Sequence, residues 1–114
     1  MTGSGLSELS VRQLRARRRR LAGGLADAEA TLHGVLLSKG RRCSSEGCRC
    51  RRGELHGPYS YLAIYADGRS RTIYVPAASE ASVAERVALT RRNEALLGEI
   101  SLINLELLRR RALE

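Results

Sequence analysis

Phenylalanine and tryptophan are absent from this 114-residue sequence, which also contains only one methionine and two prolines. These absences exclude a large aromatic core, so leucines at helical intervals must provide most of the packing. No apolar run is long enough to cross a bilayer, and the N-terminal segment lacks the hydrophobic middle of a signal peptide. We therefore expect a cytoplasmic protein with no membrane partner.

Sequence patterns typical of enzymes are also missing. There is no glycine-rich phosphate loop and no His-Glu metal-hydrolase motif. Three cysteines cannot all pair within one chain, and the redox pattern Cys-x-x-Cys does not occur. The sequence therefore predicts neither an enzyme with a small-molecule substrate nor a disulfide scaffold.

Acidic residues are few relative to basic ones, 12 against 20, which gives a formal net charge of +8. Residues 1–40 and 41–75 each carry seven basic and three acidic side chains, whereas residues 76–114 carry six of each. Every basic residue except Lys39 is an arginine, which suits bidentate contacts to phosphate. The charge favours a nucleic-acid partner, DNA in particular, although arginine runs are also common on solvated helix faces.

Two long helices are predicted, at residues 6–39 and 77–114, after a flexible tail at 1–5. Ser10 and Gln13 have the spacing of a capping box near the start of the first helix. Each helix carries an apolar stripe, so we expect an antiparallel, coiled-coil-like pair in a single domain of residues 1–114. The stripes consist of Leu14, Leu21, Leu25, Leu32 and Val35, and of Leu89, Leu96, Ile100, Ile103 and Leu107.

Residues 40–76 are expected to form a small head between these helices. The run YSYLAIYADGRSRTIYVP alternates with the period of a strand and breaks at Asp67-Gly68, a strong hairpin signal. A two-residue turn would place Tyr61 opposite Tyr74 and bring all four tyrosines to one face. The predicted fold class is mostly α (α+β): two long helices flanking a zinc-knuckle-like loop plus a β-hairpin.

All three cysteines lie near one histidine in the sequence. Cys43, Cys48, Cys50 and His56 have the composition of a closed structural zinc site, which readily combines three thiolates with one imidazole. Neighbouring arginines would favour the thiolate forms, and the head is too small to be stable on its own core. Zn²⁺ is therefore the predicted cofactor.

Other interpretations of this segment remain open. It would also suit a tight turn with one or two buried thiols, a strained disulfide between Cys48 and Cys50, or a cysteine nucleophile paired with His56. His33, within the first predicted helix, is a reserve fourth ligand.

The run GCRCRRGELHGPYSYL, together with Cys43 and the later YVP, resembles a family of small prokaryotic proteins marked by the motif C-x4-C-x-C-x2-G-x2-H-G-P-Y. Members of that family are commonly encoded on or beside transposons and other mobile elements. The sequence departs from the pattern at Ser44, where glycine is usual, and at Ser60, where an aromatic residue is usual. The resemblance covers the central third of the chain strongly, and it implies that the motif is one unit without implying an activity.

Two functions follow as hypotheses. The first is a non-enzymatic, zinc-stapled nucleic-acid-binding accessory protein that serves a mobile element. The second is an assembly module whose helices form a homodimer or bind a larger recombinase-like partner. The tyrosines would serve in the first case as stacking surfaces and otherwise as an aromatic core. The predicted nucleic-acid contacts are Arg49, Arg51, Arg52, Arg69, Arg71, Tyr59, Tyr61, Arg17, Arg18, Arg19 and Arg20.

Overall fold

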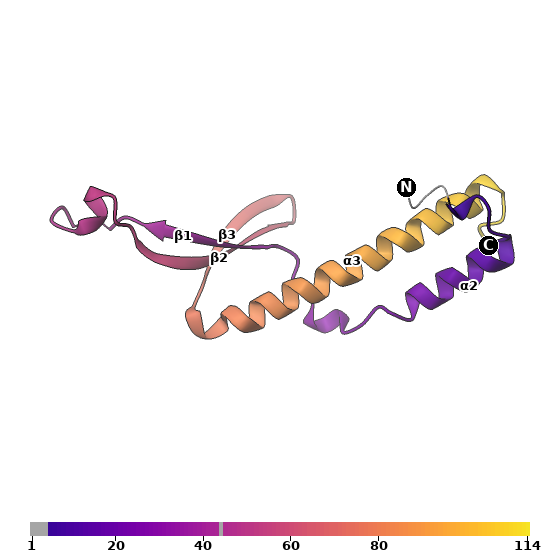
Figure 1. Cartoon of the computed structure of the whole chain (residues 1–114), viewed down its shortest axis with the longest axis horizontal. Coiled ribbons are helices and arrows are strands. Elements are labelled where there is room, and N and C mark those ends of the chain that lie inside the picture. The colour runs from indigo at the N-terminus through magenta and orange to yellow at the C-terminus, as the bar shows by residue number, and fades with distance from the viewer. Residues whose placement is uncertain (1–4, 44) are drawn as a thin grey trace. The chain divides into compact units, whose positions relative to one another are not determined.

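The computed structural model of the protein describes residues 5–43 and 45–114, and describes Arg51 by its backbone alone. The chain divides into two compact units, one made of the residues up to Glu29 together with Arg91–Glu114, the other of Ala30–Thr90. None of the described helices combines the length and the apolar character needed to cross a membrane. The main elements (Figure 1) are α2 (Val11–Ala22), β1 (Val35–Arg41), β2 (His56–Ala66), β3 (Arg69–Val75) and α3 (Glu80–Arg109), with short 3-10 turns η1 (Ala28–Ala30), η2 (Arg49–Arg52) and η3 (Ala77–Ser79).

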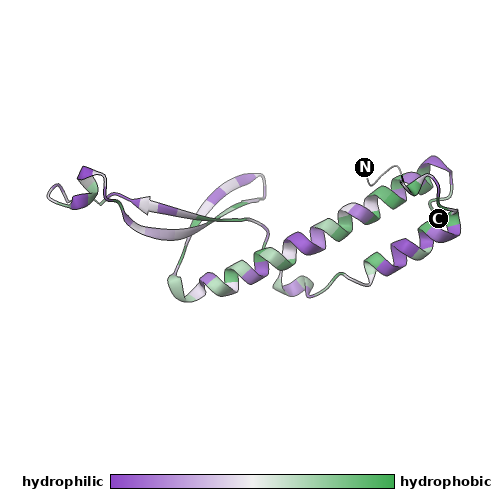
Figure 2. Ribbon diagram, in the orientation of Figure 1, coloured by the Kyte–Doolittle hydropathy of each residue, from purple (hydrophilic) through white to green (hydrophobic). Residues whose placement is uncertain are grey.

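The first unit packs α2 against the C-terminal part of α3. The predicted capping box begins α2, since Ser10 Oγ accepts from the Gln13 N–H at 3.1 Å and Gln13 Oε1 accepts from the Ser10 N–H at 2.8 Å. Most of α2 is hydrophilic (Figure 2), because half of its residues are arginines. Its contribution to the core is therefore narrow. The buried cluster consists of Leu6, Leu14, Ile103 and Leu107.

An arginine network closes the same unit. Arg110 donates to the backbone carbonyls of Leu6 and Leu9, and its Nε donates to Glu106 Oε2 at 2.7 Å. Hydrogen bonds from Arg109 and Arg110 hold the pKa of the Glu106 carboxyl below its ordinary value. The end of α3 is thereby fastened to the segment that precedes α2.

The second unit contains a three-stranded antiparallel sheet in the order β1-β2-β3. The predicted hairpin is confirmed: Tyr61 pairs with Tyr74, and the turn lies at Asp67-Gly68. Both turn residues have positive φ, 55° and 72°, as a type I′ turn requires. The side chains of β2 and β3 are thus fixed in register, with successive residues on opposite faces.

The start of α3 covers one face of this sheet. Leu62 from β2, Val75 from β3 and Val87 from α3 form its buried cluster. Partly buried Leu32, Leu36 and Val83 pack against them. Thr90 Oγ1 accepts from the Leu32 N–H at 2.6 Å, which ties the segment before β1 to α3.

The prediction of two long helices flanking a hairpin is wrong. The helix expected at 6–39 is a short helix, α2, followed by η1 and the strand β1, so only α3 is long and no coiled-coil-like pair of equal helices exists in the described chain. Gly23 caps α2, and a Cβ on Gly24 would lie 3.2 Å from Leu96, so the glycine pair ends the helix where the chain turns close to α3. After the glycine pair, Val35–Arg41 forms backbone hydrogen bonds with β2. This pairing stabilises a strand, although the spacing of the leucines is also compatible with a helix.

Candidate metal centre

The four predicted metal ligands converge at one end of the sheet. The cysteine-containing loop projects beyond β1 and β2, at the end of the sheet opposite to the β2–β3 turn (Figure 1). Arg41 of β1 pairs with His56, the first residue of β2, so the chain just after β1 lies beside His56. That pairing brings Cys43 to His56, and the loop between them returns Cys48 and Cys50 to the same place.

The donor atoms form a compact group, with all four within 4.8 Å of one another. Cys43 Sγ lies 3.6 Å from Cys50 Sγ, and Cys48 Sγ lies 3.0 Å from His56 Nε2. Cys50 is fully buried and accepts a hydrogen bond from the Cys43 N–H at 3.3 Å, while the other three residues are partly buried.

The backbone of the loop explains this convergence. Cys48 precedes η2 and Cys50 lies within it, so one tight turn directs both side chains inward. Gly53 ends η2 in the left-handed region with φ 105°, which few other residues adopt. Gly57 also has positive φ, and a Cβ there would lie 2.7 Å from the Tyr59 nitrogen. The two glycines are therefore required by the path of the chain.

The donor set fits a tetrahedral metal ion. With metal–sulfur bonds of about 2.3 Å, two sulfurs of a tetrahedron are about 3.8 Å apart, close to the 3.6 Å between Cys43 and Cys50. The contact between Cys48 and His56 is a thiol–imidazole hydrogen bond that would lengthen by about half an ångström on metal binding. Four donors with no carboxylate among them can hold a metal ion, and His33 does not belong to this group.

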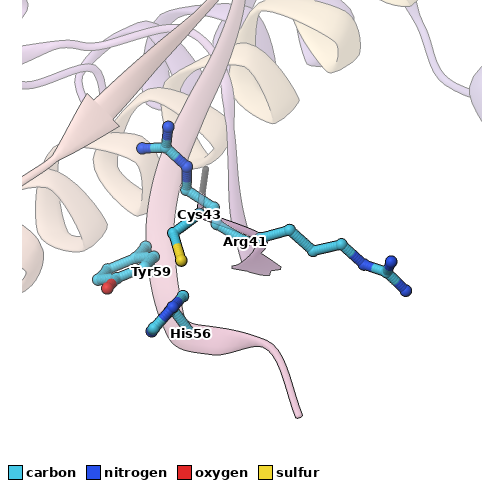
Figure 3. A pocket seen from close by; sticks show the side chains of 5 residues that line it. Arg41, Cys43, His56 and Tyr59 are labelled. Carbon is cyan, nitrogen blue, oxygen red and sulfur yellow. The ribbon is translucent and has the colours of Figure 1, made fainter. Parts of the chain in front are cut away.

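A pocket of about 300 Å³ opens beside the cluster (Figure 3). Its lining combines the end of β1 with the start of β2. In Figure 3 the sulfur of Cys43 lies on the same side as the rings of His56 and Tyr59, while the side chain of Arg41 extends away from them. The lining residues are Arg41, Arg42, Cys43, His56 and Tyr59.

The predicted nucleic-acid contacts do not form one patch. Arg49 and Arg52 lie on η2 at the metal end, whereas Arg69 and Arg71 begin β3 beside the hairpin turn. The eleven residues of β2 separate these two pairs by roughly 30 Å at 3.3 Å per residue. The side chain of Arg51 lies outside the described residues.

The other predicted arginine contacts belong to α2 of the first unit; they are Arg17, Arg18, Arg19 and Arg20. Arg18 donates to Asn104 Oδ1 at 2.7 Å and therefore has a structural contact within that unit.

The tyrosines cluster more closely than the arginines. Tyr59 and Tyr61 each meet Tyr74 edge to face, with ring centroids 6.3 and 5.9 Å apart. Lys39 of β1 places its Nζ 5.2 Å from the centre of the Tyr61 ring. The sequence analysis did not predict Lys39 and Arg41 as site residues, because it did not assign residues 35–41 to a strand. A third strand at 35–41 places both residues beside β2.

A family profile described as "Domain of unknown function (DUF6788)" matches residues 11–85 of the chain. The chain belongs to this family. The DUF6788 segment contains α2, the whole sheet, the four metal-ligand candidates and the first residues of α3. Neither the curated proteins nor the solved structures include a significant match.

Proposed function

We propose that this DUF6788 protein is a non-enzymatic nucleic-acid-binding accessory protein whose sheet is stapled at one end by Zn²⁺. The observation that carries the proposal is the convergence of three thiols and one imidazole within 4.8 Å, in a loop rich in arginine. A mobile genetic element is the proposed setting, on the strength of the Cys/His motif from Cys43 to Tyr59. The compartment we propose is the cytoplasm.

Zinc is the proposed ion because the site offers four donors, and three of them are soft thiolate sulfurs. Three thiolates and an imidazole suit tetrahedral Zn²⁺, whereas calcium and magnesium prefer oxygen ligands. The ion would be held by Cys43, Cys48, Cys50 and His56, which fill all four positions and leave none for water. That argument supports a structural role and speaks against hydrolytic catalysis at this centre.

The charge around the sheet supports an anionic partner. Lys39, Arg41 and Arg42 lie at the metal end of β1, and all three are exposed. Arg49 Nη1 lies 3.9 Å from Glu54 Oε2, and both side chains are exposed. An exposed ion pair of this kind is weak, so Arg49 can exchange Glu54 for a phosphate group. Phosphate groups would neutralise these side chains and release counterions.

A titration at several salt concentrations tests this proposal. We expect the logarithm of the binding constant for DNA or RNA to fall steeply and linearly with the logarithm of the salt concentration. Arg49→Gln with Arg52→Gln should reduce that slope by roughly 1.4 to 1.8, because two phosphate contacts are lost. Arg91→Gln with Arg92→Gln on α3 removes the same charge as a matched control. A slope near zero for the unaltered protein would contradict the proposal.

Self-association is a second candidate function, favoured by the outer surface of α3. Four leucines of its C-terminal half are exposed, and unpaired apolar side chains on one helix are typical of an interface. Light scattering over a range of concentrations should then show a dimer, which Leu97→Glu with Leu108→Glu should convert to a monomer. A monomer throughout would contradict this function. The four exposed leucines of this surface are Leu97, Leu102, Leu105 and Leu108.

A further inference from the structure

The face of the sheet opposite to α3 carries an aromatic surface that the metal centre does not use. Side chains alternate along each strand, so Leu62 and Val75 face α3 while their neighbours Tyr61 and Tyr74 face the other way. We call this surface the tyrosine face. It consists of Leu37, Lys39, Tyr59, Tyr61 and Tyr74.

The pairing of the strands places these five side chains side by side. Leu37, Tyr61 and Tyr74 form one row across all three strands, and Lys39 lies opposite Tyr59 in the next row. Tyr74 is 51% exposed, Leu37 and Lys39 are also exposed, and Tyr59 and Tyr61 are partly buried. An apolar and aromatic surface of this kind, left open on a small sheet, indicates a binding partner.

Charge beside the tyrosine face indicates the chemistry of that partner. Lys39 lies over the Tyr61 ring, and the pocket lined by Arg41, Arg42 and Tyr59 continues the face toward the metal centre. Residues 39–75 contain eight basic and three acidic side chains. Aromatic rings next to unneutralised cations suit bases and phosphates together, which is the composition of a nucleic-acid strand.

The dimensions of the sheet favour single-stranded nucleic acid over duplex nucleic acid as the ligand. A two-stranded ribbon enters the major groove, which is about 12 Å wide. The backbones of the three strands alone span about 10 Å, so the sheet with its side chains is too wide for that groove. In addition, α3 covers the second face of the sheet. Rings on an open sheet face stack on bases that are splayed out of a helix, as in a single strand.

We propose that the tyrosine face binds single-stranded nucleic acid, with bases stacking on Tyr59, Tyr61 and Tyr74 and phosphates meeting Lys39, Arg41 and Arg42. This inference rests on the nucleic-acid binding proposed above and adds the form of the ligand and the surface that holds it. The metal centre would keep Tyr59 and the two arginines in place at the end of the face.

The test uses the full-length, zinc-loaded protein and fluorescence anisotropy at low salt. The probes are oligothymidylate and oligouridylate of about twelve nucleotides, within the usual site sizes of roughly 4–16, an abasic oligomer of equal length, and a duplex. We expect both base-containing single strands to bind more tightly than the abasic strand and the duplex. Quenching of tyrosine fluorescence by the single strands should accompany binding, since the sequence has no tryptophan to obscure it.

Variants of Tyr74 locate the site. Tyr74→Ala should weaken binding of the single strands by roughly 5- to 150-fold, the loss expected for one stacked base. Tyr74→Phe keeps the ring and should bind as the unaltered protein does. Leu25→Ala in the other unit is a control, because Leu25 is exposed and belongs to neither proposed binding surface. Circular dichroism and zinc content establish that each variant is folded. If Tyr74→Ala does not fold, the difference in affinity between the base-containing and abasic strands still tests whether bases stack on the protein.

Three results would overturn the inference. They are equal affinity for abasic and base-containing strands, tighter binding of the duplex, and unchanged affinity in folded Tyr74→Ala. In the third case, loss of self-association in the same variant would assign the face to a second copy of the chain. Absence of binding to every probe at low salt would instead remove the proposed function itself.

Discussion

Cys50→Ser is expected to lose stoichiometric zinc and, with it, the ordered loop at the end of the sheet. Cys50 is the one fully buried donor of the four, and it receives the Cys43 N–H. A serine hydroxyl is a poor zinc ligand, and in zinc-finger peptides the metal contributes about 10–16 kcal/mol, which is also folding free energy. Because Ala30–Thr90 has only a small buried cluster of its own, the loss should extend into β1 and β2.

Elemental analysis of protein purified without added metal, combined with limited proteolysis, measures this effect. Ser45→Ala is the matched control, because it alters the same loop without removing a donor. One zinc per chain should be found in the unaltered protein and in Ser45→Ala. One zinc per chain in Cys50→Ser, with the loop still resistant to protease, would contradict the assignment of the ligands.

Leu107→Ala is expected to lower the free energy of unfolding by about 2–5 kcal/mol. Its side chain is fully buried with Leu14 and Ile103, and truncation would remove apolar contact and leave a cavity that α2 and α3 cannot fully close. The core of this unit contains few large side chains, so one leucine is a considerable part of it. Urea denaturation followed by circular dichroism gives the difference.

Leu105→Ala makes the same chemical change on the same helix and is the control. Leu105 is 59% exposed, so its truncation should alter the free energy of unfolding by no more than about 0.5 kcal/mol. Both variants are compared at a concentration where light scattering reports a monomer. Equal losses for the two variants would mean that Leu107 does not belong to a packed core.

Local signals predicted the hairpin and the cysteine–histidine cluster well. Asp67-Gly68 specifies a turn through its own backbone preferences, and the alternation around it sets the register of Tyr61 with Tyr74. The cysteines and His56 lie within fourteen residues, so a tight loop was enough to gather them. Neither feature depends on a distant part of the chain.

Residues 23–41 could not be predicted in the same way. Leu25, Leu32 and Val35 recur at helical intervals, and the choice against a helix comes from β2, which lies more than twenty residues further along the chain. Leu32 packs with the cluster around Leu62 instead of continuing the stripe of α2. The missing third strand also hid the position of Lys39 on the tyrosine face.

The most direct test of the central claim is X-ray absorption at the zinc edge of the purified, full-length protein. Ligation by Cys43, Cys48, Cys50 and His56 predicts three sulfur atoms at about 2.3 Å and one nitrogen atom at about 2.0–2.1 Å. The Cys50→Ser variant should show no such shell. A zinc ion surrounded only by oxygen and nitrogen, or a protein that takes up no zinc at all, would contradict the account.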